Sequence, residues 1–457
     1  MKSAKIPRLM IAAPGSGSGK TTIVCAILKA LMQKGLRVAA FKSGPDYIDP
    51  MFHSRVIGAK SRNLDVFMLG KEIVSFLLAK NSADMDVSVL EGAMGFYDGM
   101  GKTSDASAYD LASATNTPVV LVVNGKGAAL SIAATIKGFK DFRSDSHVVG
   151  AILNNMNPMS YIFYKETIEK ETGIKLLGYF PVMKDCNFES RHLGLVTAAE
   201  IGDLQNIVDR LAEQAIKSIN LDALLEIARS ADVLDYVDHT VEKIGSCRIA
   251  LAEDKAFCFY YQDALDLLYE LGAELVSFSP VDDNELPPCD GIFLGGGYPE
   301  LYAKKLAENT SMLTSIKNAL AQGTPCYAEC GGFMYLLERY KDKENIYNWV
   351  GFLQGESALT SKLQHFGYVH LEAQEDNVLT PRGGKINAHE FHYSDSTNNG
   401  TCFAVQKASG RGEWACGIAS PNLYAGYPHL HLWGNEKFAK NFIQACLSFA
   451  KKNNKKG

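Results

Sequence analysis

The sequence predicts an α/β protein built from two doubly wound domains. Strand-like and helical stretches alternate through the first half, and the same alternation restarts after a helical, charge-rich segment. In addition, 457 residues are too many for one ordinary domain. We therefore place the domains at residues 1–235 and 246–457, with a connector at 236–245.

The first domain is expected to contain buried parallel strands, because its apolar runs are continuous and rich in β-branched residues. These runs are Leu9–Ala13, Arg37–Phe41, Val87–Leu90, Val119–Val123, Val148–Leu153 and Leu176–Tyr179. A helix is predicted at Thr21–Lys34, closed by Gly35. The segment Leu221–Gly245 is helical and charge-rich without strand signals, so it is interpreted as leading into the connector.

The second domain restarts with a predicted strand at Cys247–Leu251 and a helix at Gln262–Leu271. Three further strands are predicted at Glu274–Phe278, Gly291–Leu294 and Cys326–Ala328. This order again predicts a doubly wound sheet with helices on its faces.

Composition excludes several classes of protein. With 46 Lys and Arg against 51 Asp and Glu, the chain has no general attraction to nucleic acid or an anionic membrane. Apolar runs such as Pro118–Val123 are far shorter than the roughly 20 residues that span a bilayer. The ten Cys lack C-x-x-C spacing, so neither a disulfide scaffold nor structural zinc is indicated. We expect a cytoplasmic protein with no nucleic-acid and no membrane partner.

A phosphate-binding loop is predicted where strand Leu9–Ala13 runs into a Gly-rich turn and a helix. Its residues are Gly15, Ser16, Gly17, Ser18, Gly19, Lys20, Thr21 and Thr22. The glycines let backbone N–H groups approach phosphate oxygens, Lys20 adds a cation, and the Thr21 hydroxyl can hold Mg²⁺. Pro14 replaces the first Gly of the full motif. The order of strand, turn and helix favours nucleotide binding over a plain structural turn.

Carboxylates follow two neighbouring strands, at the sheet edge where such folds bind ligands. Asp46 lies in the segment Lys42–Pro50, and Glu91 opens the segment Glu91–Gly99. A strand-end Asp is often only turn chemistry, but beside a phosphate loop Asp46 and Glu91 are expected to bind Mg²⁺. Asn154 and Asn155 follow another strand, and they fit either base recognition or a structural turn.

A nucleophile is predicted at Cys330, which stands between a strand and two glycines that open a helix. Such a sharp turn raises the thiol above the sheet, and the helix N-terminus favours the thiolate. His429 and His431 lie on one side of an extended run, and either could serve as the base. Backbone N–H groups of Gly296, Gly297 and Gly331 are candidates for an oxyanion site.

The segment His389–His392 reads His-Glu-Phe-His, which lacks the spacing of the H-E-x-x-H zinc motif. A substrate contact or a structural role is therefore favoured there over a metal site.

The second domain resembles class I glutamine amidotransferase domains of the cobalamin-synthesis type, which are flavodoxin-like. The resemblance rests on A-E-C-G-G-F-M-Y-L at Ala328–Leu336 and G-G-G-Y-P-E at Gly295–Glu300. The first domain resembles the P-loop NTPase-like amidoligase domain of the dethiobiotin-synthetase type. Its matching segments are Ala13–Thr22, Gly44–Pro50 and Glu91–Gly99.

With H-E-F-H-Y-S at His389–Ser394, essentially the whole chain resembles the cobyrinate a,c-diamide synthase family. This resemblance implies that Cys330 releases ammonia from glutamine, and that ATP activates two substrate carboxylates as acyl phosphates. It implies ATP and Mg²⁺ as cofactors, with Asp49 and Asp98 affecting the substrate or an intermediate. Glutamine and a cobyrinate-like tetrapyrrole are the implied substrates, and a homodimer is a further expectation.

The resemblance leaves alternatives open. In related glutaminases the catalytic His follows a Tyr-x pair, which fits His429, although His431 could serve instead. The usual third carboxylate has no clear counterpart after either His, so the orientation of the His is unassigned. A closely similar family amidates nickel sirohydrochlorin, and cobyric acid synthases share both domains. A different class of interpretation is a nucleotide switch or partner-binding protein with a degenerate second domain.

Overall fold

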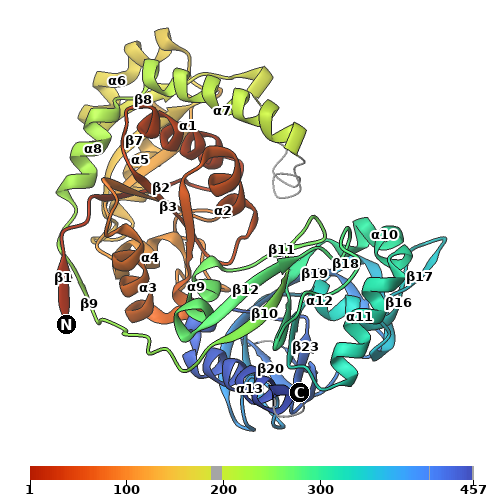
Figure 1. Ribbon diagram of the computed structural model, residues 1–457. Coiled ribbons are helices and arrows are strands. Elements are labelled where there is room, and N and C mark those ends of the chain that lie inside the picture. The colour runs from red at the N-terminus through yellow and green to blue at the C-terminus, as the bar shows by residue number, and fades with distance from the viewer. Residues whose placement is uncertain (187–197, 411, 455–457) are drawn as a thin grey trace. The chain divides into compact units, whose positions relative to one another are not determined.

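The chain folds as two units, Met1–His239 and Thr240–Gly457 (Figure 1). The computed structural model describes residues 1–186, 198–410 and 412–454. The junction between the units lies inside the segment 236–245, which the sequence analysis assigned to the connector.

A seven-stranded parallel sheet organises the first unit, in the order β4-β3-β5-β2-β6-β7-β8. The strands are β2 (Arg8–Ala12), β3 (Val38–Ser43), β4 (Lys60–Leu64), β5 (Val87–Glu91), β6 (Val119–Asn124), β7 (Val148–Asn154) and β8 (Lys175–Phe180). All six predicted strands are confirmed. The sequence analysis missed β4, because its residues Lys-Ser-Arg-Asn-Leu are mostly polar and it lies at the sheet edge.

Helices cover both faces of this sheet (Figure 1). They are α1 (Lys20–Gln33), α2 (Ile48–Phe52), α3 (Val66–Ser82), α4 (Ala108–Ala114), α5 (Ser131–Asp141), α6 (Pro158–Thr172), α7 (Ala198–Ser218) and α8 (Leu221–Ser230), with the short turns η1 (His53–Ile57) and η2 (Lys184–Cys186). Leu9 and Ile11 of β2 pack in one core with α1, α7 and α8. Met10, between them, is equally buried and points to the opposite face, as the strand period requires.

The segment Leu221–Gly245 corrects one expectation. It begins with helix α8, as predicted, but it also contains a strand, β9 (Leu234–Tyr236). This strand pairs antiparallel with β1 (Lys2–Ala4). No strand signal was visible at β9, because the strand is only three residues long and its partner β1 lies more than 200 residues away in the chain.

The second unit contains a six-stranded sheet in the order β12-β10-β13-β15-β23-β22, which is parallel except for β22. Its strands are β10 (Cys247–Ala252), β12 (Ala273–Phe278), β13 (Gly291–Leu294), β15 (Cys326–Glu329), β22 (Ile418–Ser420) and β23 (Leu423–Gly426). The accompanying helices are α9 (Gln262–Leu271), α10 (Ala303–Glu308), α11 (Thr310–Ala321), α12 (Gly331–Leu336) and α13 (Glu436–Asn454), with the turns η4 (Pro299–Tyr302) and η5 (Leu432–Gly434). All predicted elements of this domain are confirmed.

A second, largely antiparallel sheet was not predicted. Its strands are β16 (Leu337–Lys341), β17 (Ile346–Asn348), β18 (Leu353–Ala373), β19 (Lys385–Ser396), β20 (Phe403–Lys407), β21 (Glu413–Cys416) and β24 (His429–Leu430). A short ribbon joins β11 (Phe257–Phe259) to β14 (Gly296–Gly297). Strands β18 and β19 mix polar with apolar residues, and their pairing is set by tertiary contacts rather than by a continuous apolar run.

Among the described residues, no helix has both the length and the apolar character needed to cross a membrane. All ten cysteines are free thiols, and only Cys289 is more than marginally exposed.

A fully buried arginine ties strand β2 to the loops around it. The Arg8 guanidinium donates hydrogen bonds to the backbone oxygens of Ile6, Thr115, Asn116 and Asp232 and to the Thr117 hydroxyl. Burial lowers the pKa of Arg8 to about 10, and the charge of Asp232 opposes this shift. Because each acceptor is already committed to this cation, its removal leaves several buried carbonyl groups unpaired.

We expect Arg8→Met to lower the free energy of unfolding of the first unit by about 3–5 kcal/mol. The matched control is Arg37→Met, which removes an exposed arginine paired with Asp86. Exposed ion pairs contribute about 0–1 kcal/mol, so the control should change little. Urea unfolding followed by circular dichroism measures both, and equal losses would contradict the assignment of Arg8.

Candidate functional sites

The predicted phosphate loop lies between β2 and α1. Gly19 adopts φ 87°, and a side-chain Cβ there would lie 2.1 Å from Nδ2 of Asn154. The Asn154 amide donates to the backbone oxygen of Ser18 at 2.9 Å. Asn154 therefore holds the backbone of the phosphate loop in place. This contact favours a structural role for Asn154 over base recognition. Asn155 donates to Asn124 at an exposed position.

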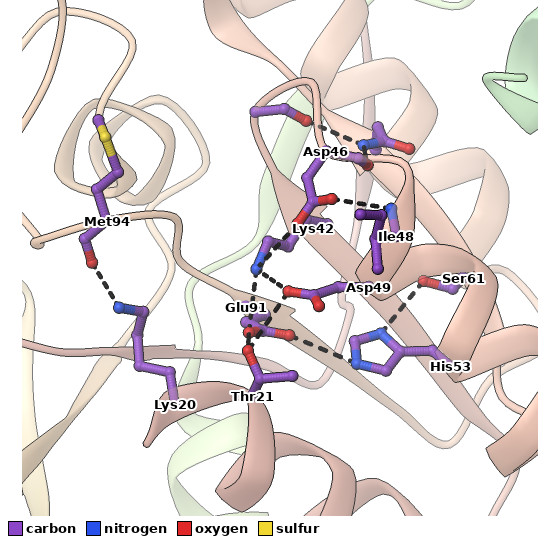
Figure 2. Close-up of polar contacts among 12 residues, drawn as sticks. Lys20, Thr21, Lys42, Asp46, Ile48, Asp49, His53, Ser61, Glu91 and Met94 are labelled. Atoms are coloured by element: carbon purple, nitrogen blue, oxygen red, sulfur yellow. Dashed lines mark hydrogen bonds and ion pairs between the residues drawn. The ribbon is translucent and has the colours of Figure 1, made fainter. Parts of the chain in front are cut away.

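Lys20 is buried, and its ammonium lies along the loop. Nζ donates to the backbone oxygens of Met94 at 2.5 Å and Gly15 at 3.4 Å (Figure 2). Burial lowers the pKa of Lys20, the Lys42 charge lowers it further, and nearby carboxylates, including Asp98, oppose the shift. Asp98 accepts a hydrogen bond from Gly95 N at 3.1 Å, which places it in the loop after β5.

A buried ammonium lies among three carboxylates at the ends of β3 and β5. Figure 2 shows Nζ of Lys42 facing Asp46, Asp49 and Glu91. Nζ lies 3.0 Å from Oε1 of Glu91 and 3.7 Å from Oδ2 of Asp46, and it also donates to Asp49. Asp46, Asp49 and Glu91 are thus gathered, as parallel strand ends require.

Negative groups outnumber positive ones in this cluster, because three carboxylates share the Lys42 ammonium. Burial, opposed by Lys42, raises the pKa of Glu91 to about 7. Burial, followed by the charge of Asp49, raises the pKa of Asp46 to about 6. Burial alone would lower the pKa of Lys42, but the three carboxylates raise it above its ordinary value. The carboxylates that Lys42 does not neutralise can therefore bind a further cation.

Thr21 and His53 complete the cluster (Figure 2). The Thr21 hydroxyl donates to Oε1 of Glu91 at 2.7 Å and lies 3.4 Å from Oδ2 of Asp49. Nε2 of His53 lies 3.4 Å from Oε2 of Glu91. Burial lowers the pKa of His53 to about 4, so the ring is neutral near pH 7.

Sequence reasoning assigned no role to Lys42 or His53. Lys42 is the first residue of the motif Lys42–Pro50, so its place in the sequence could have nominated it as a site residue. His53 lies beyond that motif, and only the fold brings it to Glu91.

The donor set fits Mg²⁺ held together with phosphate oxygens. Thr21, Asp46 and Glu91 supply hydroxyl and carboxylate oxygens, which Mg²⁺ prefers. Among the described residues, no group of three or more His, Cys, Asp or Glu is arranged to hold a metal by itself.

In the second unit, Cys330 lies directly after the central strand β15. It adopts φ 46° and ψ −102°, and α12 begins at the next residue. A left-handed φ is rare outside glycine and costs energy that the surrounding structure must supply. Cys330 N donates to the backbone oxygen of Gly426 at the end of β23, which holds the turn in place. This is the geometry of the predicted nucleophile elbow.

The glycines predicted for the oxyanion site lie around this turn. A Cβ on Gly296 would lie 2.6 Å from Cε1 of His429, and a Cβ on Gly331 would lie 3.3 Å from the backbone N of Gly297. Only glycine leaves room for the two loops to approach so closely. The structure thus gathers Gly296, Gly297 and Gly331 beside Cys330 and His429.

His429 interacts with Cys330 through a side-chain hydrogen bond. Burial acts to lower the pKa of His429, but the charges and hydrogen bonds of Cys330 and Glu329 outweigh it and raise the value to about 10. The raised pKa therefore favours a protonated imidazole ring at His429, next to the Cys330 side chain.

His431 lies apart from this pair. Its ring stacks on Tyr261 at 4.9 Å, and neither ring nitrogen has a hydrogen-bond partner among the described residues. Burial lowers its pKa to about 3. Of the two histidines that the sequence offered, His429 is the one placed to act on Cys330.

Glu329 is the site residue that sequence reasoning missed. It is buried, and Oε2 lies 3.5 Å from Nδ1 of His429. The usual third carboxylate of related glutaminases follows the His, whereas Glu329 precedes the Cys. A signal was present, because the residue before a strand-end nucleophile also lies at that strand end.

The segment His389–His392 belongs to β19, opposite β24. His392 is buried, stacks on Tyr427 at 3.9 Å and donates from Nδ1 to Ser394 O. Nε2 of His392 lies 3.7 Å from Oε2 of Glu390, which is also buried. The segment therefore packs beside the loop that carries His429, as a structural role predicts.

Comparison with known proteins supports both halves of the fold. A model of the CobQ/CobB/MinD/ParA nucleotide binding domain matches residues 9–195, and a CobB/CobQ-like glutamine amidotransferase domain matches residues 248–437. These matches confirm the predicted fold class of two α/β domains, the first of P-loop NTPase type and the second of glutamine amidotransferase type.

Curated relatives match almost the whole chain. The cobyrinate a,c-diamide synthase of Clostridium tetani is 41% identical over 95% of this chain and 99% of its own length. The synthase of Thermoplasma volcanium is also 41% identical, over 98% of this chain and 99% of its own length. Among solved structures, the GDP complex of signal recognition particle 54 kDa protein from Aeropyrum pernix has 17% identity and a TM-score of 0.31, covering 46% of this chain and 49% of that one.

Two neutral histidines, the buried His431 and the half-buried His389, should make the stability of the second unit depend on pH. Burial lowers the pKa of His431 to about 3, and burial with the nearby charge of His429 does the same for His389. Between pH 6.5 and 3 the unfolded chain binds protons at these rings and the folded chain does not, so stability falls on acidification. His431→Phe should flatten this slope by up to about 1.4 kcal/mol per pH unit.

Urea unfolding at a series of pH values measures the slope. The control is His370→Gln, which changes an exposed histidine on β18. An unchanged slope in His431→Phe would show that this ring is not held neutral in the folded state.

Proposed function

Since the chain belongs to the cobyrinate a,c-diamide synthase family, we propose that it amidates the a and c acetate side chains of cobyrinate, using ammonia from glutamine. The protein is an enzyme, a ligase of the glutamine amidotransferase class. Two observations carry the proposal together. Cys330 is paired with His429 in one unit, and the other unit holds a phosphate loop with clustered carboxylates.

In the second unit, the Cys330 thiolate attacks the amide carbon of glutamine. Backbone N–H groups of Gly296, Gly297 and Gly331 stabilise the oxyanion, and the His429 imidazolium gives its proton to the departing ammonia. Water then attacks the thioester, with neutral His429 as base, which releases glutamate and restores the thiol. The elbow geometry and the close approach of the glycines support these roles.

In the first unit, ATP binds along Gly15–Thr22, with Lys20 as the cation. Thr21, Asp46 and Glu91 would hold Mg²⁺, which neutralises phosphate charge when bound. A carboxylate oxygen of the substrate attacks the γ-phosphorus, giving an acyl phosphate and ADP. Ammonia then attacks the acyl carbon, and phosphate leaves as the amide forms.

Asp49 and Asp98 are assigned to handling the substrate or the intermediate. Asp49 contacts Lys42 and Thr21, and Asp98 lies in the loop beside Lys20. Activation is required because a carboxylate is a poor electrophile, and ammonia alone does not displace its oxygen. A cytoplasmic location and a homodimer remain predictions.

Replacing the nucleophile should separate the two half-reactions. We expect Cys330→Ala to lower glutamine-driven amidation by about 10³-fold or more while ammonia-driven amidation continues. The matched control is Cys326→Ala, which removes a buried thiol on the same strand. Lys20→Met should suppress amidation from either nitrogen source, because both depend on ATP. Product formation with glutamine or ammonium chloride measures all three, and normal ammonia-driven turnover in Lys20→Met would refute the phosphate role.

The choice of tetrapyrrole is tested by competition among substrates. Purified enzyme with ATP, Mg²⁺ and glutamine should add two amides to cobyrinate, at a higher kcat/KM than to hydrogenobyrinate or nickel sirohydrochlorin. Mass spectrometry counts the amides. Preference for nickel sirohydrochlorin would transfer the proposal to that substrate, and no amidation of any of the three would overturn it.

A further inference from the structure

A buried carboxylate lies on the side of His429 that faces away from the nucleophile. Oε2 of Glu329 is 3.5 Å from Nδ1 of His429, and both side chains are about 4% exposed. Since Nδ1 faces Glu329, the other ring nitrogen remains for the hydrogen bond to Cys330. Carboxylate, imidazole and thiol therefore follow one another in the order of a catalytic triad.

The chain offers no such carboxylate downstream of the histidine. After His429 the sequence runs Leu-His-Leu-Trp-Gly-Asn, and the first acidic residue is Glu436, at the start of α13. Glu329 reaches the same place from the opposite direction, because β15 ends beside the strand that carries His429.

We propose that Glu329 is the positioning residue that orients His429 toward Cys330. This inference rests on the proposed glutaminase role of Cys330. Glu329 does not touch glutamine in this assignment, and it acts only through the imidazole ring. The nucleophile and its positioning carboxylate are then consecutive residues of one strand end.

Glu329 is itself held in place. Its Oε1 accepts hydrogen bonds from the backbone N–H of Leu430, at 3.0 Å, and from the Tyr327 hydroxyl. Both bonds go to the same oxygen, so Oε2 remains directed at His429. The bond to Leu430 fixes the carboxylate relative to the residue next to His429, and it therefore sets the approach of the two side chains. A separation of 3.5 Å is long for a hydrogen bond, and such contacts commonly shorten when substrate is bound.

Three other ionisable groups lie near the His429 ring, and none of them is suited to orient it as Glu329 does. Cys330 is the nucleophile itself, and it shares the transferred proton with His429. His389 of β19 stands opposite His429, and its pKa is lowered to about 3 by burial and then by the charge of His429. It is therefore neutral in the working range. Tyr327 is buried and its pKa is raised by burial and by Glu329, so it acts as a neutral donor.

The competing explanation is that Glu329 only fastens β15 to β24 through Leu430. Glu329→Gln separates the two, because its amide oxygen can still accept from Leu430 while the negative charge is lost. Without that charge the imidazolium is less favoured, so the thiolate fraction at neutral pH falls. A purely structural role would leave the reactivity of the thiol and its pH profile unchanged.

The test measures Glu329→Gln on the full-length enzyme in two ways. Glutamine hydrolysis should lose about 10²- to 10⁴-fold in kcat with KM changed less than about threefold, while ammonia-driven amidation stays normal. Alkylation of Cys330 by iodoacetamide should slow at pH 7 and recover as the pH rises past about 8.5, where an ordinary thiol ionises. The matched control is Glu274→Gln, an exposed glutamate on β12 of the same sheet, which should change neither.

Wild-type kcat or an unchanged alkylation profile in Glu329→Gln would overturn the proposal. Equal loss of glutamine- and ammonia-driven activity would do so as well, since it indicates a folding defect. Tyr327→Phe, which removes one donor but keeps the carboxylate, should cost less than Glu329→Gln, and the reverse order would count against it. A wild-type enzyme without glutaminase activity would instead refute the proposed function, and alkylation still reports on Glu329 in that case.

Discussion

Charge that is buried at the end of a parallel strand must be balanced inside the protein, and both sites depend on this requirement. In the first unit, the Lys42 ammonium lies among Asp46, Asp49 and Glu91, and it offsets part of the cost of ionising the buried Asp49 and Glu91. In the second unit, His429 is fully enclosed, yet its pKa rises because Cys330 and Glu329 compensate its charge. In both units, the charged side chains assigned to the site therefore also stabilise one another electrostatically.

Strand order explains why these groups meet. In the first unit β5 lies between β3 and β2, so the phosphate loop and both carboxylate segments emerge at adjacent positions of one edge. In the second unit β15 lies between β13 and β23, which brings the Gly296 and His429 segments to either side of Cys330. After β23 the chain leaves the parallel sheet and pairs through β24 with β19. His429 lies at this transition, which fixes its backbone from both sheets.

The two sites provide different environments, one in each unit. A catalytic thiolate requires a neighbouring cation and close backbone N–H groups. The strained backbone conformation of Cys330 directs its thiol toward both. Phosphoryl transfer requires cations arranged along a Gly-rich loop, and carboxylates that can take a further metal charge.

Local sequence patterns were enough to predict the α/β class and the parallel strands, and to nominate the phosphate loop, Cys330 and the carboxylates Asp46, Asp49 and Glu91. These features are local: apolar runs, glycines and polar residues at strand ends lie within a few residues of one another. The folded chain places His429, rather than His431, next to Cys330, and it brings Lys42 and His53 to Glu91 and Glu329 to His429. Each of these depends on contacts between residues far apart in the chain, and the antiparallel sheet was missed for the same reason. Hydrophobic periodicity reports which face of a segment is buried, whereas it carries no information about which buried polar atoms will face each other.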